Sequence, residues 1–219
     1  MRIIDIYRRY MIMPNLQQHM FRVAAVGSVI CDSISEKVDR DSIVAACLLH
    51  DMGNIIKFKL DLFPSFVEPQ GIEYWRKVQN DFFEKYGREE HIATIKIAKE
   101  IGVDDTVMTL LESIGFLQAK ENFETADFDK KIAAYSDMRV EPYGVVSLEE
   151  RLRDGRKRTI VHKPNSTDFV HFTEMAKYLK KIETQIFEKT SISPDDVTDK
   201  KISIYLEKLR DFDISVHKS

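Results

Sequence analysis

The sequence predicts an all-α protein, and three of its properties indicate this fold class. Apolar residues recur at helical spacing through most of the chain, as they do in helices that bury one face against a core. Only 8 glycines and 6 prolines occur among the 219 residues, and the Asn-Gly pair that favours β-hairpin turns is absent. Hydrophobic residues make up 43% of the chain, which is enough to form a sizeable core. We therefore expect a bundle of long helices.

The first two strong helical segments contain the most apolar part of the chain. One begins after Pro14, and its buried stripe consists of Leu16, Met20, Val23, Gly27, Ile30, Cys31 and Ile34. The other is capped by Asp39 or Asp41 and is apolar on every side from Ile43 to Leu49, before it ends near Gly53. Because a helix that is apolar all round must be enclosed by other elements, we expect this second helix at the centre of the protein.

The rest of the chain predicts a loop and a series of further helices. Residues 58–70 break the helical pattern and are long enough to form a lid or specificity loop. Helices are expected over residues 72–86, Ile92–Gly102, 104–117 and Phe128–Tyr135, after the capping box Ser147/Glu150, over Phe172–Ile186, and after Ser193-Pro194-Asp195. Residues 153–166 are basic, and we expect them to be irregular. This pattern predicts a main helical domain over residues 1–160 and a helical C-terminal extension over 161–219, packed on the same domain or on the partner in a homodimer.

Composition and charge exclude several classes of protein. The net charge of −3 and the pI near 6.1 argue against a protein that binds nucleic acid through its overall charge. No run of about 18 apolar residues predicts a membrane span, and the first residues lack the features of a signal peptide. Cys31 and Cys47 both lie in apolar helical patterns and are interpreted as free thiols in a reducing compartment. We therefore expect a cytoplasmic protein.

The dipeptide His50-Asp51 is the first candidate for chemistry, because it ends the wholly apolar helix. Buried ionisable groups are costly unless they are paired or bind a metal. The C-terminal end of a helix also favours a cation, because the helix dipole is negative there. The dipeptide alone is a weak signal, since a histidine at a helix end often bonds only to the last carbonyl groups while its neighbour is solvated.

Two further positions strengthen this interpretation. His19 borders the buried stripe of the first strong helix, and Arg22 lies one turn later on the same side. Asp137 follows two alanines that permit close approach of another backbone. Two imidazoles and two carboxylates form a mixed nitrogen and oxygen ligand set, which suits Mn, Fe, Co, Ni, Zn or Mg. Each residue also has a structural alternative: His19 as a core histidine, and Asp137 in an ion pair with Arg139 or Arg151.

The order and context of these residues resemble a known family. The segments LQQHMFRVA (residues 16–24), AACLLHDMG (45–53) and AYSDMRV (134–140) resemble the H…HD…D signature of the HD-domain metal-dependent phosphohydrolase superfamily. The resemblance covers about residues 10–155. It implies an all-α HD-type domain in which His19, His50, Asp51 and Asp137 bind a divalent metal. It also implies hydrolysis of a phosphate ester, usually of a nucleotide.

The sequence departs from this pattern at two places. Many relatives have lysine directly after His-Asp-x-Gly, whereas this chain has Asn54 there and Lys57 three residues later. Relatives that bind two metals carry extra histidines before the final aspartate, and this chain offers only His91 there. Because His91 is in phase with Ile95 and Ala98, we expect it to face inward, where it would support a metal ligand or face the substrate, with a core histidine as the close alternative.

The leading hypothesis is a metal-dependent phosphohydrolase that acts on a nucleotide or another small phosphate ester. Asp51 would ligate the metal and orient the attacking water, while Arg22 and Lys57 would stabilise negative charge on the phosphoryl oxygens. The loop of residues 58–70 would lie beside the site and shape substrate choice through its three phenylalanines, Phe58, Phe63 and Phe66.

Two alternative functions remain open from the sequence. One is a non-catalytic ligand-binding or regulatory module, for which the departure at Asn54 leaves room. The other is an RNA-associated protein that uses the basic segment of residues 151–163. A basic run of this kind is more often a solvated face, so nucleic-acid binding is the less favoured interpretation. His162, His171 and His217 are interpreted as surface or structural residues.

Overall fold

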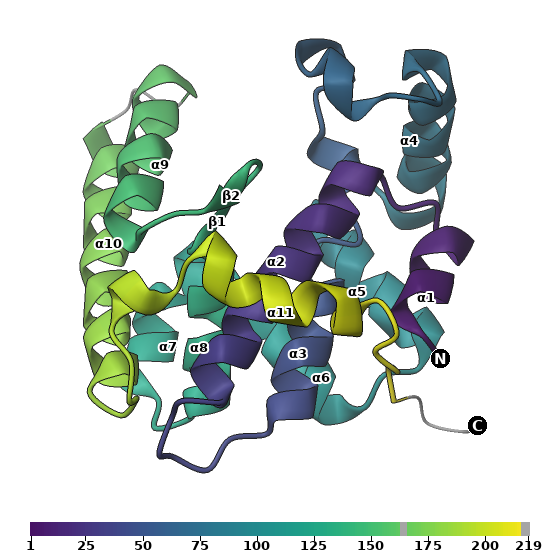
Figure 1. Ribbon diagram of the computed structural model, residues 1–219. Coiled ribbons are helices and arrows are strands. Elements are labelled where there is room, and N and C mark those ends of the chain that lie inside the picture. Colours follow the sequence, from purple (N-terminus) through teal and green to yellow (C-terminus); the bar gives the residue numbers. More distant parts are fainter. Residues whose placement is uncertain (163–165, 216–219) are drawn as a thin grey trace.

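Figure 1 shows that the protein is built almost entirely from helices, with one small two-stranded hairpin. The structure is a computed structural model, and it describes residues 1–162 and 166–215, with side chains described outside residues 158–167. The α-helices are α1 (Ile3–Arg9), α2 (Pro14–Cys31), α3 (Arg40–Leu49), α4 (Ile72–Tyr86), α5 (Glu90–Ile101), α6 (Asp105–Ser113), α7 (Ala119–Glu124), α8 (Phe128–Asp137), α9 (Leu148–His162), α10 (Ser166–Phe187) and α11 (Asp199–Leu209). The strands are β1 (Val140–Glu141) and β2 (Gly144–Val145), and the 3-10 helices are η1 (Asn54–Lys57), η2 (Leu60–Leu62), η3 (Pro64–Phe66), η4 (Phe116–Gln118) and η5 (Pro194–Asp196). The predicted all-α fold class is therefore confirmed.

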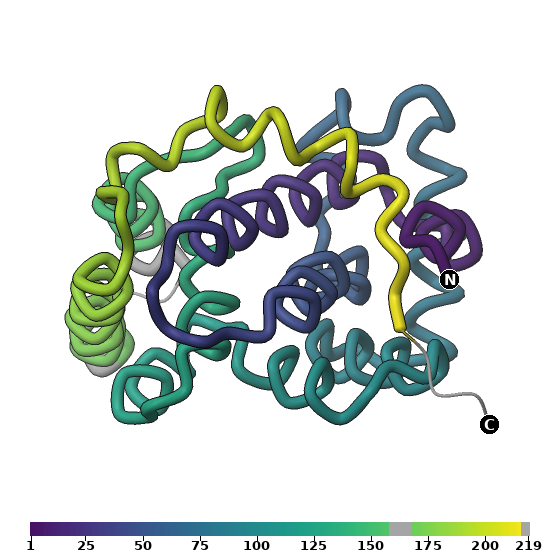
Figure 2. The backbone as a smooth tube through the Cα atoms, turned by 60° about the horizontal axis from the view of Figure 1, so that its bottom comes forward, coloured from purple at the N-terminus to yellow at the C-terminus, as the bar shows by residue number. Residues whose placement is uncertain are grey.

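Helices α2 and α3 form the centre of the protein, as Figure 2 shows for the two dark inner helices. Every residue from Val23 to Ile30 in α2 and from Ser42 to Leu49 in α3 is buried. Helices α6 and α8 pack against α3, and α11 lies along α2. The prediction of a central helix that is apolar on every side is confirmed, because neighbours cover α3 all round.

A close approach of three helices brings the predicted site residues to one end of the bundle. A β-carbon on Gly27 of α2 would lie 3.4 Å from Ser136 Oγ of α8 and 3.6 Å from Cys47 Sγ of α3. Side chains of α8 and α3 therefore pack directly on this point of α2. Because α2 and α3 run in opposite directions, the first half of α2 lies beside the last turn of α3, where the helix ends at His50.

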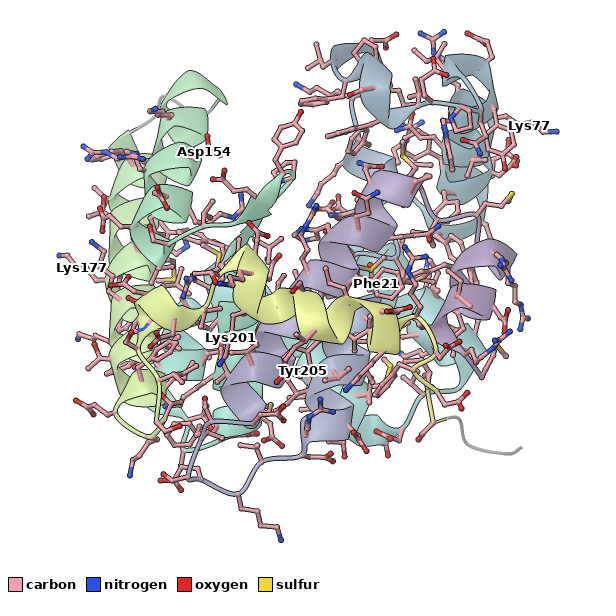
Figure 3. All side chains as sticks on the ribbon, in the orientation of Figure 1. Phe21, Lys77, Asp154, Lys177, Lys201 and Tyr205 are labelled. Atoms are coloured by element: carbon pink, nitrogen blue, oxygen red, sulfur yellow. The ribbon has the colours of Figure 1, made fainter. Side chains whose placement is uncertain are left out.

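The C-terminal helices pack against the rest of the structure along two faces. Helix α10 contacts α7, α8 and α9, while α11 crosses α2. In Figure 3, Tyr205 of α11 lies where α11 crosses the central helices, and its hydroxyl donates to Asp32 Oδ2 over 2.6 Å. Lys177 points outward from α10 on the opposite side from Lys77 of α4. The division into residues 1–160 and 161–219, and the possible homodimer, stay predictions.

Several predicted helix bounds agree with the structure and others are wrong. Helix α4 spans the predicted residues 72–86, and the predicted capping box at Ser147 opens α9 through hydrogen bonds with Glu150. The fifth predicted helix ends at Ser113 instead of 117, because the chain becomes extended at Ile114. The basic segment is helical as far as His162, so the expected irregular stretch is wrong up to that residue, and residues 163–165 lie outside the described part.

The prediction for the start of the last helix is also wrong. Ser193-Pro194-Asp195 opens the 3-10 helix η5, in which Ser193 and Asp196 form a reciprocal cap. The chain then becomes extended at Val197, and α11 begins only after Thr198 caps Lys201 N. A single capped turn is therefore enough to account for the Ser-Pro pattern, and this pattern does not require a long helix.

Within the described residues, no helix has both the length and the apolarity that a membrane span needs.

Candidate metal centre

Four predicted residues converge where α2, α3 and α8 meet. His19 Nε2 lies 3.1 Å from Asp137 Oδ1 and 3.5 Å from Asp51 Oδ2. The rings of His19 and His50 lie 5.3 Å apart between centroids. Because these side chains come from helices that are far apart in the sequence, the fold rather than local spacing assembles the cluster.

His50 is oriented by a backbone hydrogen bond. Its Nδ1 lies 2.8 Å from the carbonyl oxygen of Cys47, and since a carbonyl can only accept, Nδ1 carries the proton. Nε2 is then the ring nitrogen that can ligate a metal, and it points toward the carboxylates, 3.3 Å from Asp137 Oδ1 and 3.6 Å from Asp51 Oδ1. This Nε2 is buried and has no hydrogen-bond partner among the described residues. A metal-ligating histidine is oriented in this way, with its other ring nitrogen fixed by a hydrogen bond.

The donor set fits a divalent metal. Ligand atoms of His19, His50 and Asp51 all lie within 4.8 Å of one another. Asp137 Oδ1 is within 3.3 Å of both imidazoles, so it completes a cluster of two nitrogen and two oxygen donors. Imidazole and carboxylate ligands together suit transition-metal ions and Mg²⁺.

The charges of the cluster shift the pKa values of its members. Burial lowers the pKa of His50, but the negative charges of Asp51 and Asp137 outweigh burial and raise it to about 9. Burial raises the pKa of Asp137, but its interactions with His19 and His50 outweigh burial and hold that pKa well below the usual value. The two carboxylates therefore attract positive charge into a buried place, which a proton or a metal cation can supply.

Helix α5 fixes the turn that follows His50-Asp51. The backbone N–H of Gly53 donates to Thr94 Oγ1 over 2.9 Å. A β-carbon on Gly53 would lie only 2.8 Å from Ala93 Cβ and 2.9 Å from the backbone nitrogen of Thr94. Glycine at this position therefore allows α5 to pack directly against the chain just after the candidate ligands.

A cavity of about 640 Å³ opens beside the cluster. Its lining includes His50, Asp51 and Asp137, so three of the four candidate ligands face it. The other walls come from α5, from the end of α6 with η4, and from α9 and α10. This volume lies in the range of cavities that hold small organic ligands, roughly 300–1,000 Å³.

Lys57 and His91 both line this cavity. Lys57 Nζ forms an ion pair with Glu90 Oε1 over 3.2 Å, which places the ammonium group at the wall formed by η1 and α5. His91 is exposed rather than buried in the core, so the alternative of a core histidine is wrong, whereas its role as a substrate-facing group of this cavity stays a prediction. The buried face of α5 instead consists of Ala93, Thr94, Ile97, Ala98 and Ile101.

Arg22 lies outside this cavity. Its Nη1 donates to the carbonyl oxygen of Pro142 over 3.2 Å, in the turn between β1 and β2. Arg22 follows His19 by one turn, as predicted, and neither residue is among those that line the cavity, so the expectation that the two side chains share one site stays a prediction. The hairpin turn therefore holds the guanidinium. Its catalytic role stays a prediction.

The loop of residues 58–70 carries a cluster of aromatic rings. The ring of Phe63 lies 5.9 Å from that of Phe58 and 5.4 Å from that of Phe66, between centroids. Phe66 also contacts Tyr143 of the hairpin turn, with 6.1 Å between centroids. The rings therefore join the loop to the hairpin on the Arg22 side, and none of these residues lines the cavity.

Sequence reasoning missed part of the cavity wall. Phe116 and Phe172 stack with 4.9 Å between centroids, and both line the cavity. Arg151 also lines it, although the sequence assigned this residue to a solvated basic segment. Arg139, by contrast, is buried in hydrogen bonds to Tyr135 Oη, Val146 O, Pro194 O and Val197 O, so it does not pair with Asp137.

Comparison with known proteins gives one family match. Residues 16–113 match the model of the HD domain. This stretch contains His19, His50 and Asp51 together with Lys57 and His91, whereas Asp137 lies beyond it. Neither the curated proteins nor the solved structures include a significant match to the chain.

Proposed function

Residues 16–113 of this chain form an HD domain, and on that premise we propose that the protein is a metal-dependent phosphohydrolase. The observation that carries the proposal is the orphaned Nε2 of His50, which faces His19, Asp51 and Asp137 in a buried cluster beside a large cavity. When bound, a divalent metal supplies Lewis-acid polarisation of a phosphoryl oxygen and makes a water more acidic.

The side chains of this chain would hold and position the reactants. His19 and His50 each offer Nε2, while Asp51 and Asp137 each offer a carboxylate oxygen. Asp51 faces the cavity and lies between the histidines and η1, so it would also orient the attacking water. Lys57, in the same wall, would stabilise negative charge on the phosphoryl oxygens as it develops.

The substrate that we propose is a small phosphate ester, with a nucleotide as the first example to test. The cavity is large enough for an organic group in addition to a phosphoryl group. Its lining combines the stacked rings of Phe116 and Phe172 with polar and charged side chains from α5 and α9. Such a mixture of a few polar groups and an apolar surface is typical of small-molecule sites.

The test is metal content combined with phosphate release. We expect about one metal ion per chain in the purified protein, with loss of metal in His50→Ala and Asp137→Ala. His171→Ala changes an exposed histidine of α10 and serves as the matched control, which should keep the metal. Wild-type protein should release phosphate from at least one member of a panel of nucleotides and sugar phosphates.

Three outcomes would change the proposal. Full metal occupancy in both site variants would remove the assignment of ligands. Two metal ions per wild-type chain would make His91 a candidate ligand, since it lines the same cavity. Metal without any phosphate release would instead support a non-catalytic ligand-binding module.

A further inference from the structure

Arg151 has an unusual position among the charged residues of the cavity. It lies in the first turn of α9, it lines the cavity together with Asp137 and Met138, and it belongs to the segment beyond the HD-domain match. Its Nε is buried and has no hydrogen-bond partner among the described residues. A buried N–H donor without a partner costs free energy, so it marks a place where a ligand acceptor is missing.

The other charges of the cavity are already matched or belong to the metal cluster. Lys57 is paired with Glu90, and Asp51 and Asp137 face the two histidines. Glu112 is exposed on α6, so water screens its charge. Arg151 forms no ion pair with a carboxylate in the described residues. Arg151 is therefore the lining cation whose charge is left for a bound anion.

Helix geometry separates Arg151 from the other basic residues of its segment. Arg153 is exposed and does not line the cavity, whereas Gly155, one turn after Arg151, does. A β-carbon on Gly155 would lie 3.2 Å from the ring of Phe172, so the glycine lets this ring pack close to α9. Arg151 thus projects beside an apolar surface, where a charge-assisted hydrogen bond is stronger than it is in water.

We propose that Arg151 is a substrate-binding residue that holds phosphate oxygens of the ligand in this cavity. Arginine suits this task because its planar guanidinium donates two parallel hydrogen bonds to a phosphate group. The group is either the phosphoryl group at the metal cluster or a second phosphate farther along the cavity. The inference rests on the proposed function for the identity of the ligand, but the binding of an anion by Arg151 does not require turnover.

The experiment measures binding of two phosphonates to the purified, metal-containing protein by calorimetry. Phenylphosphonate carries one phosphoryl group and benzene-1,4-diphosphonate carries two, and the carbon–phosphorus bond prevents ester hydrolysis. We expect Arg151→Gln to raise Kd by about ten- to hundredfold. Arg153→Gln removes the same charge from the exposed side of α9 and should leave Kd within about twofold of wild type.

The two ligands distinguish the two possible positions of the phosphate. Equal weakening of both phosphonates places Arg151 at the phosphoryl group beside the metal cluster, and weakening of the diphosphonate alone places it at a second phosphate. Arg151→Lys keeps the charge but not the two parallel bonds, so we expect an intermediate Kd. This variant also supplies the test if Arg151→Gln fails to fold, which melting curves will show.

The inference is overturned if Arg151 and Arg153 variants bind equally, or if wild-type protein binds neither phosphonate. Phosphate release from the substrate panel is measured on the same preparations. Loss of phosphonate binding in Arg151→Gln without any hydrolysis by wild type would keep this inference and remove the proposed function. Hydrolysis by wild type that Arg151→Gln leaves unchanged, with unchanged binding, would keep the function and remove the inference.

Discussion

Replacing Gly53 by alanine is expected to destabilise the protein through a steric clash alone. Gly53 has φ −89° and ψ −3°, a conformation that alanine adopts without strain. The added methyl group, however, would lie 2.8 Å from Ala93 Cβ and 2.9 Å from Thr94 N, in the first turns of α5. Ordinary contacts between such atoms are several tenths of an ångström longer, so α5 and the end of α3 must move apart.

The magnitude follows from two losses. Insertion of a methyl group into a packed interface costs about 1–3 kcal/mol. The hydrogen bond from Gly53 N to Thr94 Oγ1, whose net value is about 1 kcal/mol, lengthens or breaks when the two segments separate. We therefore expect a loss of about 2–4 kcal/mol in the free energy of unfolding. For a chain of this length, that loss lowers Tm by about 4–16 °C.

The assay is urea and thermal unfolding of metal-free protein, because bound metal would add its own stabilisation. Gly27→Ala is the matched control. Its β-carbon would meet neighbours at 3.4–3.6 Å, and alanine gains up to about 1 kcal/mol of helix propensity inside α2. We expect Gly27→Ala to stay within about 1 kcal/mol of wild type. Equal stability of the two variants would refute the steric argument for Gly53.

Two remaining predictions concern the hairpin side of the metal cluster. Phe66→Ala should leave the ratio of kcat/KM between ring-bearing and ring-free phosphate esters close to that of wild type at constant metal content, because Phe66 packs on Tyr143 and does not line the cavity; a change of about tenfold would instead support the role in substrate choice that the sequence predicts. Arg22→Lys should keep most of kcat/KM at constant metal content and Tm, because Arg22 is hydrogen-bonded to Pro142 and does not line the cavity; a loss of about ten- to thousandfold would instead support the phosphoryl contact that the sequence predicts. Turnover equal to that of wild type would mean that Arg22 acts only through its hydrogen bond to Pro142.

The sequence predicts the centre of the fold well, because there the local pattern and the packing agree. Helix α3 is apolar from Ile43 to Leu49, and such a segment has no stable position except inside the bundle. The ends of the bundle are different. Helices α1 and α7 have only 7 and 6 residues, so their apolar positions span too few turns to form a clear period.

The hairpin was missed because hydrogen bonds from outside its turn hold the two strands in place. Arg139 Nε donates to Val146 O over 2.6 Å, and Val145 N donates to Asp199 Oδ1 over 3.2 Å. A turn held by Arg139, which directly precedes β1, and by Asp199 of α11 needs no Asn-Gly signal of its own. The same contacts explain why Arg139 is structural, although its position near Asp137 made an ion pair plausible from the sequence.

The candidate ligands were accessible to sequence reasoning, whereas the cavity was not. The H…HD…D order names the four residues without any knowledge of their distances. The orientation of His91 depends on the rotation of α5 about its axis. The sequence pattern placed Ile92 and Ile95 on the buried face, whereas the structure buries Ala93 and Thr94. Arg151 and Arg153 look equivalent in a basic run, and only the packing of α9 turns one toward the cavity and the other toward solvent.

We place the phosphate ester of the proposed reaction in the cavity rather than beside the hairpin. On the hairpin side, Arg22 is hydrogen-bonded to Pro142, and the ring of Phe66 contacts that of Tyr143. On the cavity side, three of the four candidate ligands share about 640 Å³ with Lys57 and Arg151. A ligand there satisfies the buried Nε of Arg151, whereas a ligand on the hairpin side leaves it unpaired. Comparison of Arg22→Lys with Arg151→Lys under identical conditions therefore decides between the sides, and we expect the larger loss in kcat/KM from Arg151→Lys.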